Sequence, residues 1–221
     1  MIRVLAATLL LAAGAARAGE PEIDAGRPAP PRTGVPSNGV DEAPRRGTFA
    51  EASVGVFSTI GGSRRFSNAQ PWLGLTVGRD LGRAASIFAS LGVGASSNSC
   101  FQQAAAGSCA GSDSFGATFV EVGGSYGSWI APRLLLSGKL MGGISLFAPG
   151  PFTLKDGSTV AEQVMGPHAG AGVGLEYGTR LDHFAVGLDA VLRYSLASAP
   201  DGGGRTGIAS LALAPRVRYV F

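Results

Sequence analysis

The composition of this chain differs from that of an ordinary soluble domain. Its 221 residues are 45% hydrophobic and only 15% charged, and 35 of them are glycine. Soluble domains usually carry about 25% charged residues. The net charge is only +3, and the lysines and arginines are scattered, which gives nucleic-acid binding little support. Much of the surface is therefore expected to face something other than water.

Residues 1–18 have the three parts of a secretory signal peptide. Arg3 supplies a positive start, residues 4–13 are apolar, and Ala16 and Ala18 form a small-x-small cleavage site before Gly19. The alternative is a membrane anchor, but the apolar run is about 10 residues long, against the roughly 20 of a membrane-spanning helix. No cysteine follows the site, and no later segment has a long apolar run. The sequence therefore predicts export.

Residues 19–46 are predicted to form a Pro-rich arm on the periplasmic side. Its prolines lie among polar and charged residues, at positions 21, 28, 30, 31, 36 and 44. Proline cannot donate to a sheet ladder and favours extended backbone, so this segment is expected to be a mobile tether. The alternative interpretation is a docking arm for a periplasmic partner or for peptidoglycan.

From Gly47 to Phe221 the dominant repeat is two residues, which is the repeat of a β-strand. In residues 70–81, for example, Leu73, Leu75 and Val77 alternate with small or polar residues. The predicted strands are residues 48–57, 70–81, 85–95, 115–126, 132–147, 165–177, 180–196 and 207–221. A soluble β-sandwich or a lipocalin-like barrel could show the same alternation.

Three observations favour an eight-stranded antiparallel up-and-down barrel in the outer membrane. The polar face is mostly Gly, Ala and Ser, which suit the inside of a narrow barrel. Long links (58–69, 96–114, 148–164, 197–206) alternate with short ones (82–84, 127–131, 178–179), as expected for outer loops and periplasmic turns. Aromatic residues lie near strand ends, as in the two girdles of such barrels. The periplasmic girdle is expected from Tyr126, Tyr177, Tyr219 and Phe221, and the opposite one from Phe57, Phe147 and Tyr194.

The lumen of this barrel is predicted to hold a network of charges. The inward residues with titratable side chains are Glu51, Glu121, Lys139, Glu176, His183, Asp189, Arg193, Arg216 and Arg218. Both signs are present, and a buried charge without a partner is very costly. We expect the charges to pair and to plug the interior. The alternative is a small ion path whose selectivity these side chains set.

Two further features concern assembly. Cys100 and Cys109 are the only cysteines, and they lie in one predicted outer loop, so a disulfide is expected in the oxidising compartment. Metal binding is the alternative, but no nearby His or Cys completes a site. The chain ends in an apolar alternating strand with Tyr219 and Phe221, which resembles the assembly signal read by the barrel-assembly machinery.

Catalysis is not expected. Small outer-membrane barrels include lipid-modifying enzymes, and the deacylase pattern places a serine two residues after its histidine. Here Gly170 and Ala185 stand two residues after His168 and His183. No metal or cofactor is predicted.

Residues 67–78, the loop with Cys100 and Cys109, residues 181–184 and residues 215–221 resemble the CglE family of adventurous gliding motility proteins. The resemblance implies an outer-membrane component of a motility or adhesion apparatus, acting with other envelope motility proteins and surrounded by outer-membrane lipid. The expected function is therefore structural and non-enzymatic. The alternatives are a small passive channel and, less favoured, a lipid-modifying enzyme.

Overall fold

The computed structural model describes residues 46–60, 67, 69–97, 114–150, 162–181, 183–198 and 205–221. The predicted signal peptide, the predicted arm up to residue 45 and the two cysteines lie outside the described residues. No helix in the described part of the chain is long and apolar enough to span a membrane.

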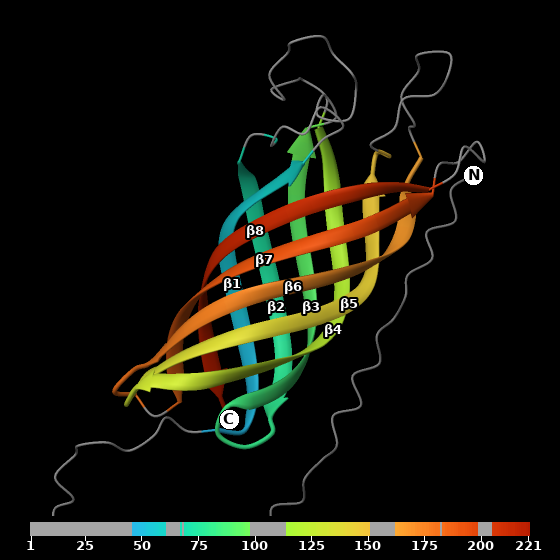
Figure 1. Ribbon diagram of the computed structural model, residues 1–221. Helices are drawn as coiled ribbons and strands as arrows, with labels where there is room; N and C mark the ends of the chain where they lie inside the picture. Colours follow the sequence, from blue (N-terminus) through green and yellow to red (C-terminus); the bar gives the residue numbers. More distant parts are fainter. Residues whose placement is uncertain are drawn as a thin grey trace, which may run out of the picture. The chain divides into compact units, whose positions relative to one another are not determined.

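Eight antiparallel strands form a closed barrel (Figure 1). Each strand pairs with its neighbours in the sequence, and β1 closes the barrel by pairing with β8 along Phe49↔Val220 to Ile60↔Ala209. The predicted up-and-down topology is confirmed. The strands are β1 (Thr48–Ile60), β2 (Gln70–Asp80), β3 (Ala85–Ser97), β4 (Ser114–Ala131), β5 (Leu134–Ala148), β6 (Val164–Gly178), β7 (Phe184–Ser198) and β8 (Arg205–Val220).

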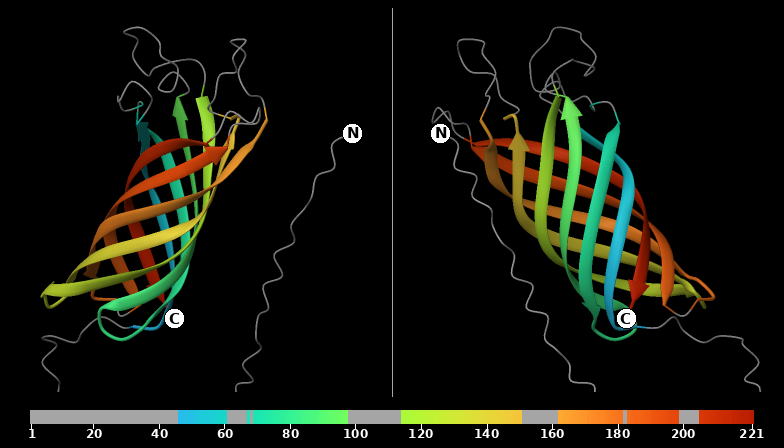
Figure 2. Two further views of the ribbon diagram at one scale, coloured as in Figure 1. Left: turned by 45° about the vertical axis from the view of Figure 1, so that its right-hand side comes forward. Right: turned by 180° about the vertical axis from the view of Figure 1, so that it is seen from behind.

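The two ends of the barrel are closed by different kinds of link. The links 81–84, 132–133 and 179–183 meet at one end, together with the start of β1 and the end of β8; we call this the short-turn end (Figure 2). The links 61–69, 98–113, 149–163 and 199–204 meet at the other, which we call the long-link end. The links 179–183 and 199–204 differ little in length. The second is short because β7 extends to Ser198 and β8 begins at Arg205.

The turn between β6 and β7 corrects one predicted boundary. The strand expected to begin at residue 180 begins at Phe184. The amide of Phe184 donates to the carbonyl of Leu181, and the amide and hydroxyl of Thr179 both donate to the carbonyl of Phe184. Polar groups of Thr179 thus stabilise a turn where periodicity alone predicted strand. In the β2–β3 turn, Gly82 adopts a positive φ of 100°, which a glycine allows without strain.

The barrel carries its aliphatic side chains on the outside. Val77 is 60% exposed, Leu140 is 71% exposed, and the aliphatic residues of the other strands also point outward. The inward Phe57 and Phe119 are fully buried. A soluble barrel or sandwich would bury the Leu and Val face, so both soluble alternatives are wrong. An apolar exterior this extensive requires an apolar surrounding.

We predict that an arginine is costly in the middle of this exterior and tolerated at its edge. Leu140 lies midway along β5, whereas Leu181, which is 65% exposed, lies in the β6–β7 turn. Leu140→Arg should lower the free energy of unfolding in lipid vesicles by about 2–4 kcal/mol, and Leu181→Arg by about 0–1 kcal/mol. Urea titration read by heat-modifiable gel mobility measures both. Equal losses would contradict the proposed contact with lipid tails.

Candidate functional site in the barrel lumen

The lumen has two layers of different chemistry. Alternate residues of a strand share a face, so Glu51 near the start of β1 and Phe57 near its end both point inward. The layer toward the long-link end is aromatic, and the layer toward the short-turn end is charged. Between them, Glu121 of β4 and Arg193 of β7 meet inside the barrel.

The aromatic layer is a packed cluster that comes from four different strands. The ring of Phe57 stacks on Trp72 with 5.5 Å between centroids, and Phe119 lies 5.9 Å from both. Phe147 contacts Phe119 edge to face at 6.3 Å and Phe115 at 5.9 Å. Such pairs add to the stability given by burial alone. We refer to these five side chains as the aromatic cluster.

Two glycines on β3 provide the space for this cluster. A Cβ atom on Gly92 would lie 2.2 Å from the Trp72 ring, and one on Gly94 would lie 2.7 Å from the Phe57 ring. These contacts are far shorter than real carbon contacts. These glycines of the polar face therefore make room for large aromatic residues of β1 and β2, rather than simply matching a narrow barrel.

The aromatic cluster corrects the predicted girdle at the long-link end. Phe57 and Phe147 were expected at the membrane interface, but they are 0% and 1% exposed and point into the lumen. Phe57 lies an even number of residues from Glu51, so the strand repeat places it on the lumen face. Of the three expected residues, only Tyr194 faces outward. At the other end, Tyr126, Tyr177, Tyr219 and Phe221 are all exposed.

Glu121 is the centre of the middle layer. Arg193 binds it with two nitrogens, at 2.6 Å from Nε to Oε1 and 3.1 Å from Nη2 to Oε2. His168 Nε2 lies 2.9 Å from Oε1, and the hydroxyl of Ser90 donates to Oε2. The guanidinium of Arg193 also lies 4.6 Å from the centre of the Trp72 ring. Four strands are linked through one buried carboxylate.

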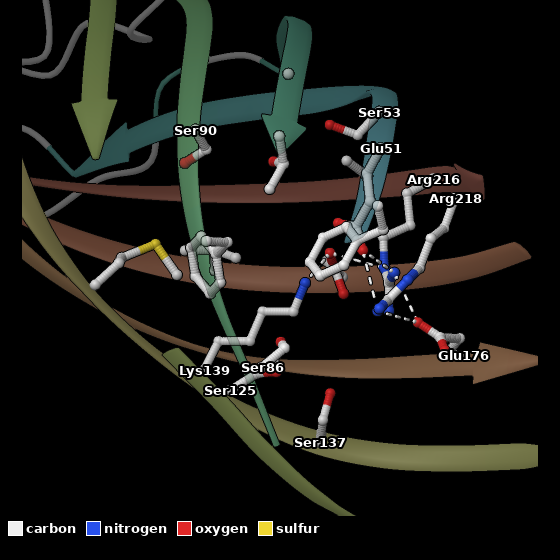
Figure 3. A pocket seen from close by; sticks show the side chains of 18 of the residues that line it. Glu51, Ser53, Ser86, Ser90, Ser125, Ser137, Lys139, Glu176, Arg216 and Arg218 are labelled. Carbon is white, nitrogen blue, oxygen red and sulfur yellow. Dashed lines mark hydrogen bonds and ion pairs between the residues drawn. The ribbon is translucent and has the colours of Figure 1, made fainter. Parts of the chain in front are cut away.

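The charged layer at the short-turn end is organised by two arginines of β8 (Figure 3). Arg216 Nη1 contacts Glu51 Oε1 at 2.7 Å and Glu176 Oε2 at 3.0 Å. Arg218 contacts the same oxygen of Glu176 at 3.2 Å. Asp189 lies 3.1 Å from Arg216 Nε and 2.6 Å from Lys139 Nζ. These predicted lumen residues come together in one network.

Two members of the network were not predicted as such. Arg46, the last residue of the predicted arm, enters the lumen and lies 3.3 Å from Glu176 and 3.6 Å from Asp80. Its guanidinium stacks over Trp129 at 4.9 Å. Asp80 also contacts Arg218 at 2.5 Å and accepts a hydrogen bond from the amide of Gly47. The inward position of Asp80 follows from the strand repeat, whereas nothing in the Pro-rich composition indicated a role for Arg46.

His183, which was predicted to lie on the inward face of a strand, precedes β7. It belongs to the β6–β7 turn, where its Nδ1 lies 2.6 Å from the carbonyl oxygen of Val220 and its ring stacks on Tyr219 at 5.6 Å. The physical reason is the later start of β7, because a turn residue does not follow the inward and outward alternation of a strand.

The lumen charges of the described residues are balanced. Five basic side chains face five acidic ones, with His168 as a further polar partner. The basic residues are Arg46, Lys139, Arg193, Arg216 and Arg218, and the acidic residues are Glu51, Asp80, Glu121, Glu176 and Asp189. The pairing matches what burial of charge requires.

A cavity of about 70 Å³ lies among these charges. Its walls include Glu51, Ser90, Ser137 and Lys139 (Figure 3). A cavity of this size holds several water molecules. Of the aromatic cluster, only Trp72 borders it. The cavity therefore ends where the aromatic layer begins.

Other predicted site residues have the following places. Tyr219 lies on the outer face of β8, with Phe184 and Phe221 each 5.0 Å from its ring. The amide of Phe221 donates to the carbonyl of Thr48, next to the seam between β1 and β8. No group of three His, Cys, Asp or Glu side chains in the described part of the chain is placed to hold a metal ion. The disulfide of Cys100 and Cys109 stays a prediction.

No protein-family model and no curated protein matches the chain. Its fold is similar to that of the crystal structure of Neisserial surface protein A, with a TM-score of 0.55, 14% identity, and coverage of 79% of this chain and 97% of that one. Ail, the attachment invasion locus protein of Yersinia pestis, aligns with a TM-score of 0.46, 15% identity, and coverage of 79% and 100%. The chain thus has the fold of small outer-membrane barrels.

We predict that breaking the central ion pair is more damaging than breaking one at the short-turn end. Arg193→Met leaves Glu121 buried without its main partner and should lower the free energy of unfolding by about 3–5 kcal/mol. Lys139→Met is the control and should cost less, because Asp189 keeps Arg216. Adding Glu121→Gln to Arg193→Met should recover part of the loss. Urea unfolding in vesicles tests this, and a double variant no more stable than Arg193→Met would contradict it.

The packing of Trp72 against β3 gives a second test. Gly92→Ala forces the Trp72 ring to move and should destabilise the barrel by about 1–3 kcal/mol. The matched control is Gly138→Ala on the outer face of β5, where a Cβ atom would have its nearest neighbour at 3.9 Å. This substitution should be neutral or slightly stabilising. The two unfolding midpoints and the tryptophan emission spectrum are measured, and an unchanged Gly92→Ala variant would contradict the packing.

Proposed function

We propose that this protein is a non-enzymatic outer-membrane barrel that serves as a structural and interaction component of the cell envelope. The aliphatic exterior supports insertion into a bilayer, and the predicted signal peptide supports export. The fold shared with Neisserial surface protein A agrees with an outer-membrane location.

The closed lumen is the observation that carries the structural role. Ion conduction requires a continuous water path, but the cavity stops at Trp72, Glu121 and Arg193. Beyond these residues the rings of Phe57, Phe119 and Phe147 pack against one another. With the interior occupied by its own side chains, the surfaces left for function are the two ends and the chain segments attached to them.

These ends suit a component that holds partners on both sides of the membrane. The long links are placed outside and the Pro-rich arm inside, in the orientation typical of such barrels. The resemblance to the CglE family supports a place in a gliding motility or adhesion apparatus, with other envelope proteins as partners. Tyr219 and Phe221 would serve recognition by the barrel-assembly machinery during insertion.

A small passive channel is the second candidate, and the cavity in the charged layer is the observation that favours it. Planar-bilayer recording separates the two functions. The purified wild-type barrel should give no stable single-channel steps, because the aromatic cluster and the Glu121–Arg193 pair fill the lumen. Large, stable steps from the wild type would overturn the structural role and support the channel.

A variant that opens the lumen is the control for this recording. Combining Trp72→Ala, Phe119→Ala and Arg193→Ala should produce measurable conductance, provided that the variant still shows heat-modifiable mobility. Membrane fractionation tests the location, and recovery in the soluble periplasmic fraction would contradict it. A deletion strain with normal surface movement would remove the motility role and leave the structural one.

A further inference from the structure

The charges of the barrel are sorted between its interior and its outer surface. The interior is balanced, as described above. Among residues whose side chains are described, the basic groups that remain are four arginines, Arg79, Arg83, Arg133 and Arg180, and all lie at the short-turn end. The only described acidic residue outside the lumen is Glu162, which lies at the opposite end, just before β6.

The four arginines surround the barrel rim. Arg83, Arg133 and Arg180 lie in the three short turns, which follow β2, β4 and β6 and are therefore spaced around the circumference. Arg79 points outward from the last part of β2. We name this set the arginine collar. No acidic side chain of the described residues lies within ion-pair distance of it; Asp182, in the β6–β7 turn, is outside that part of the chain.

Contacts within the collar leave its charge available. Arg133 Nη1 donates to the carbonyl of Thr179 at 3.0 Å, which joins two of the turns without neutralising the guanidinium. The carbonyl of Arg83 accepts a hydrogen bond from the indole of Trp129, so its side chain plays no part in that contact.

The collar lies next to the aromatic residues of the same rim. Tyr126 is 75% exposed on β4, and Tyr177 and Tyr219 are also exposed on β6 and β8. Aromatic rings of this kind lie at the level of the lipid headgroups. Arginines in the adjoining turns are then in reach of headgroup phosphates, which a guanidinium binds with two parallel hydrogen bonds.

We infer that the arginine collar binds the phosphates of anionic phospholipids in the leaflet at the short-turn end. Its spacing around the rim fits separate headgroups, whereas an acidic protein partner would be matched by a patch on one side. This inference rests on the proposed membrane insertion. Lipid binding would fix the depth and orientation of the barrel from its periplasmic side, independently of the long links.

Lipid preference is the test. Wild-type barrel and a variant with Arg79→Gln, Arg83→Gln, Arg133→Gln and Arg180→Gln are mixed in detergent with phosphatidylglycerol and phosphatidylcholine, and bound lipid is counted by native mass spectrometry. Each arginine near an anionic surface should raise binding by about fivefold. The wild type should prefer phosphatidylglycerol, and added salt should weaken that preference. The variant should lose it, and substitution by lysine at the same positions should keep part of it.

The inference is overturned if the wild type shows no preference for phosphatidylglycerol, or if the fourfold variant shows the same preference as the wild type. Binding of polyglutamate by the wild type, without a preference for phosphatidylglycerol, would also overturn it and assign the collar to a protein partner. If the fourfold variant does not fold, the pairs Arg79→Gln/Arg83→Gln and Arg133→Gln/Arg180→Gln should each lose about half of the preference on a logarithmic scale. Insertion of the wild type into phosphatidylcholine vesicles tests the membrane location separately, since failure there removes the proposed function as well.

Discussion

A charged side chain inside an eight-stranded barrel has little bulk water to solvate it, so it depends on partners from other strands. Arg216 of β8 contacts Glu51 of β1, Glu176 of β6 and Asp189 of β7. Backbone ladders join only adjacent strands, whereas Arg216 and Glu176 join strands separated by β7. The ion pairs therefore connect strands that share no backbone ladder. A residue with several partners, such as Arg216, links the strands that carry them, whereas loss of the main partner of a buried charge is strongly destabilising.

The aromatic layer borders the ion-pair network on the side toward the long-link end. Arg193 lies against Trp72 and Phe119 while its Nε and Nη2 donate to the two carboxylate oxygens of Glu121. The apolar rings exclude water and strengthen the pair, and the pair gives the guanidinium the counter-charge that the rings cannot supply. Dry and charged layers thus support each other. The packing of the two layers supports the proposed structural role.

The sequence predicted the fold well because a two-residue repeat is a local signal. The repeat within each strand distinguishes its apolar face from its polar face, and the alternation of long and short links indicates the topology. Pairing inside the lumen is not local. Glu121 and Arg193 come from β4 and β7 and meet only because the closed sheet brings them together across the lumen. The sequence around either residue does not indicate which residue is its partner.

The errors have separate physical causes. Phe57 and Phe147 were predicted at the rim because they lie near strand ends. The two-residue repeat places both on the inward face, and it is the more reliable indicator of the direction of a strand side chain. His183 was assigned from the two-residue repeat, but it lies in a turn that Thr179 stabilises through hydrogen bonds with Leu181 and Phe184. The lumen position of Arg46 was not predicted, because a Pro-rich composition characterises residues 19–46 as a whole and gives no information about the last residue.

The distribution of charge between the lumen and the outer surface accounts for the small share of charged residues in the described barrel. The inward charges cancel, so they stabilise the wall without creating a strong net field along the axis. The outer wall carries almost no charge, because apolar lipid tails would not solvate it. The charge of the described outer surface is therefore concentrated at the short-turn end, which also carries exposed tyrosines. Among the residues that the structure describes, ten of the charged side chains pair inside the lumen and four arginines lie at the short-turn end.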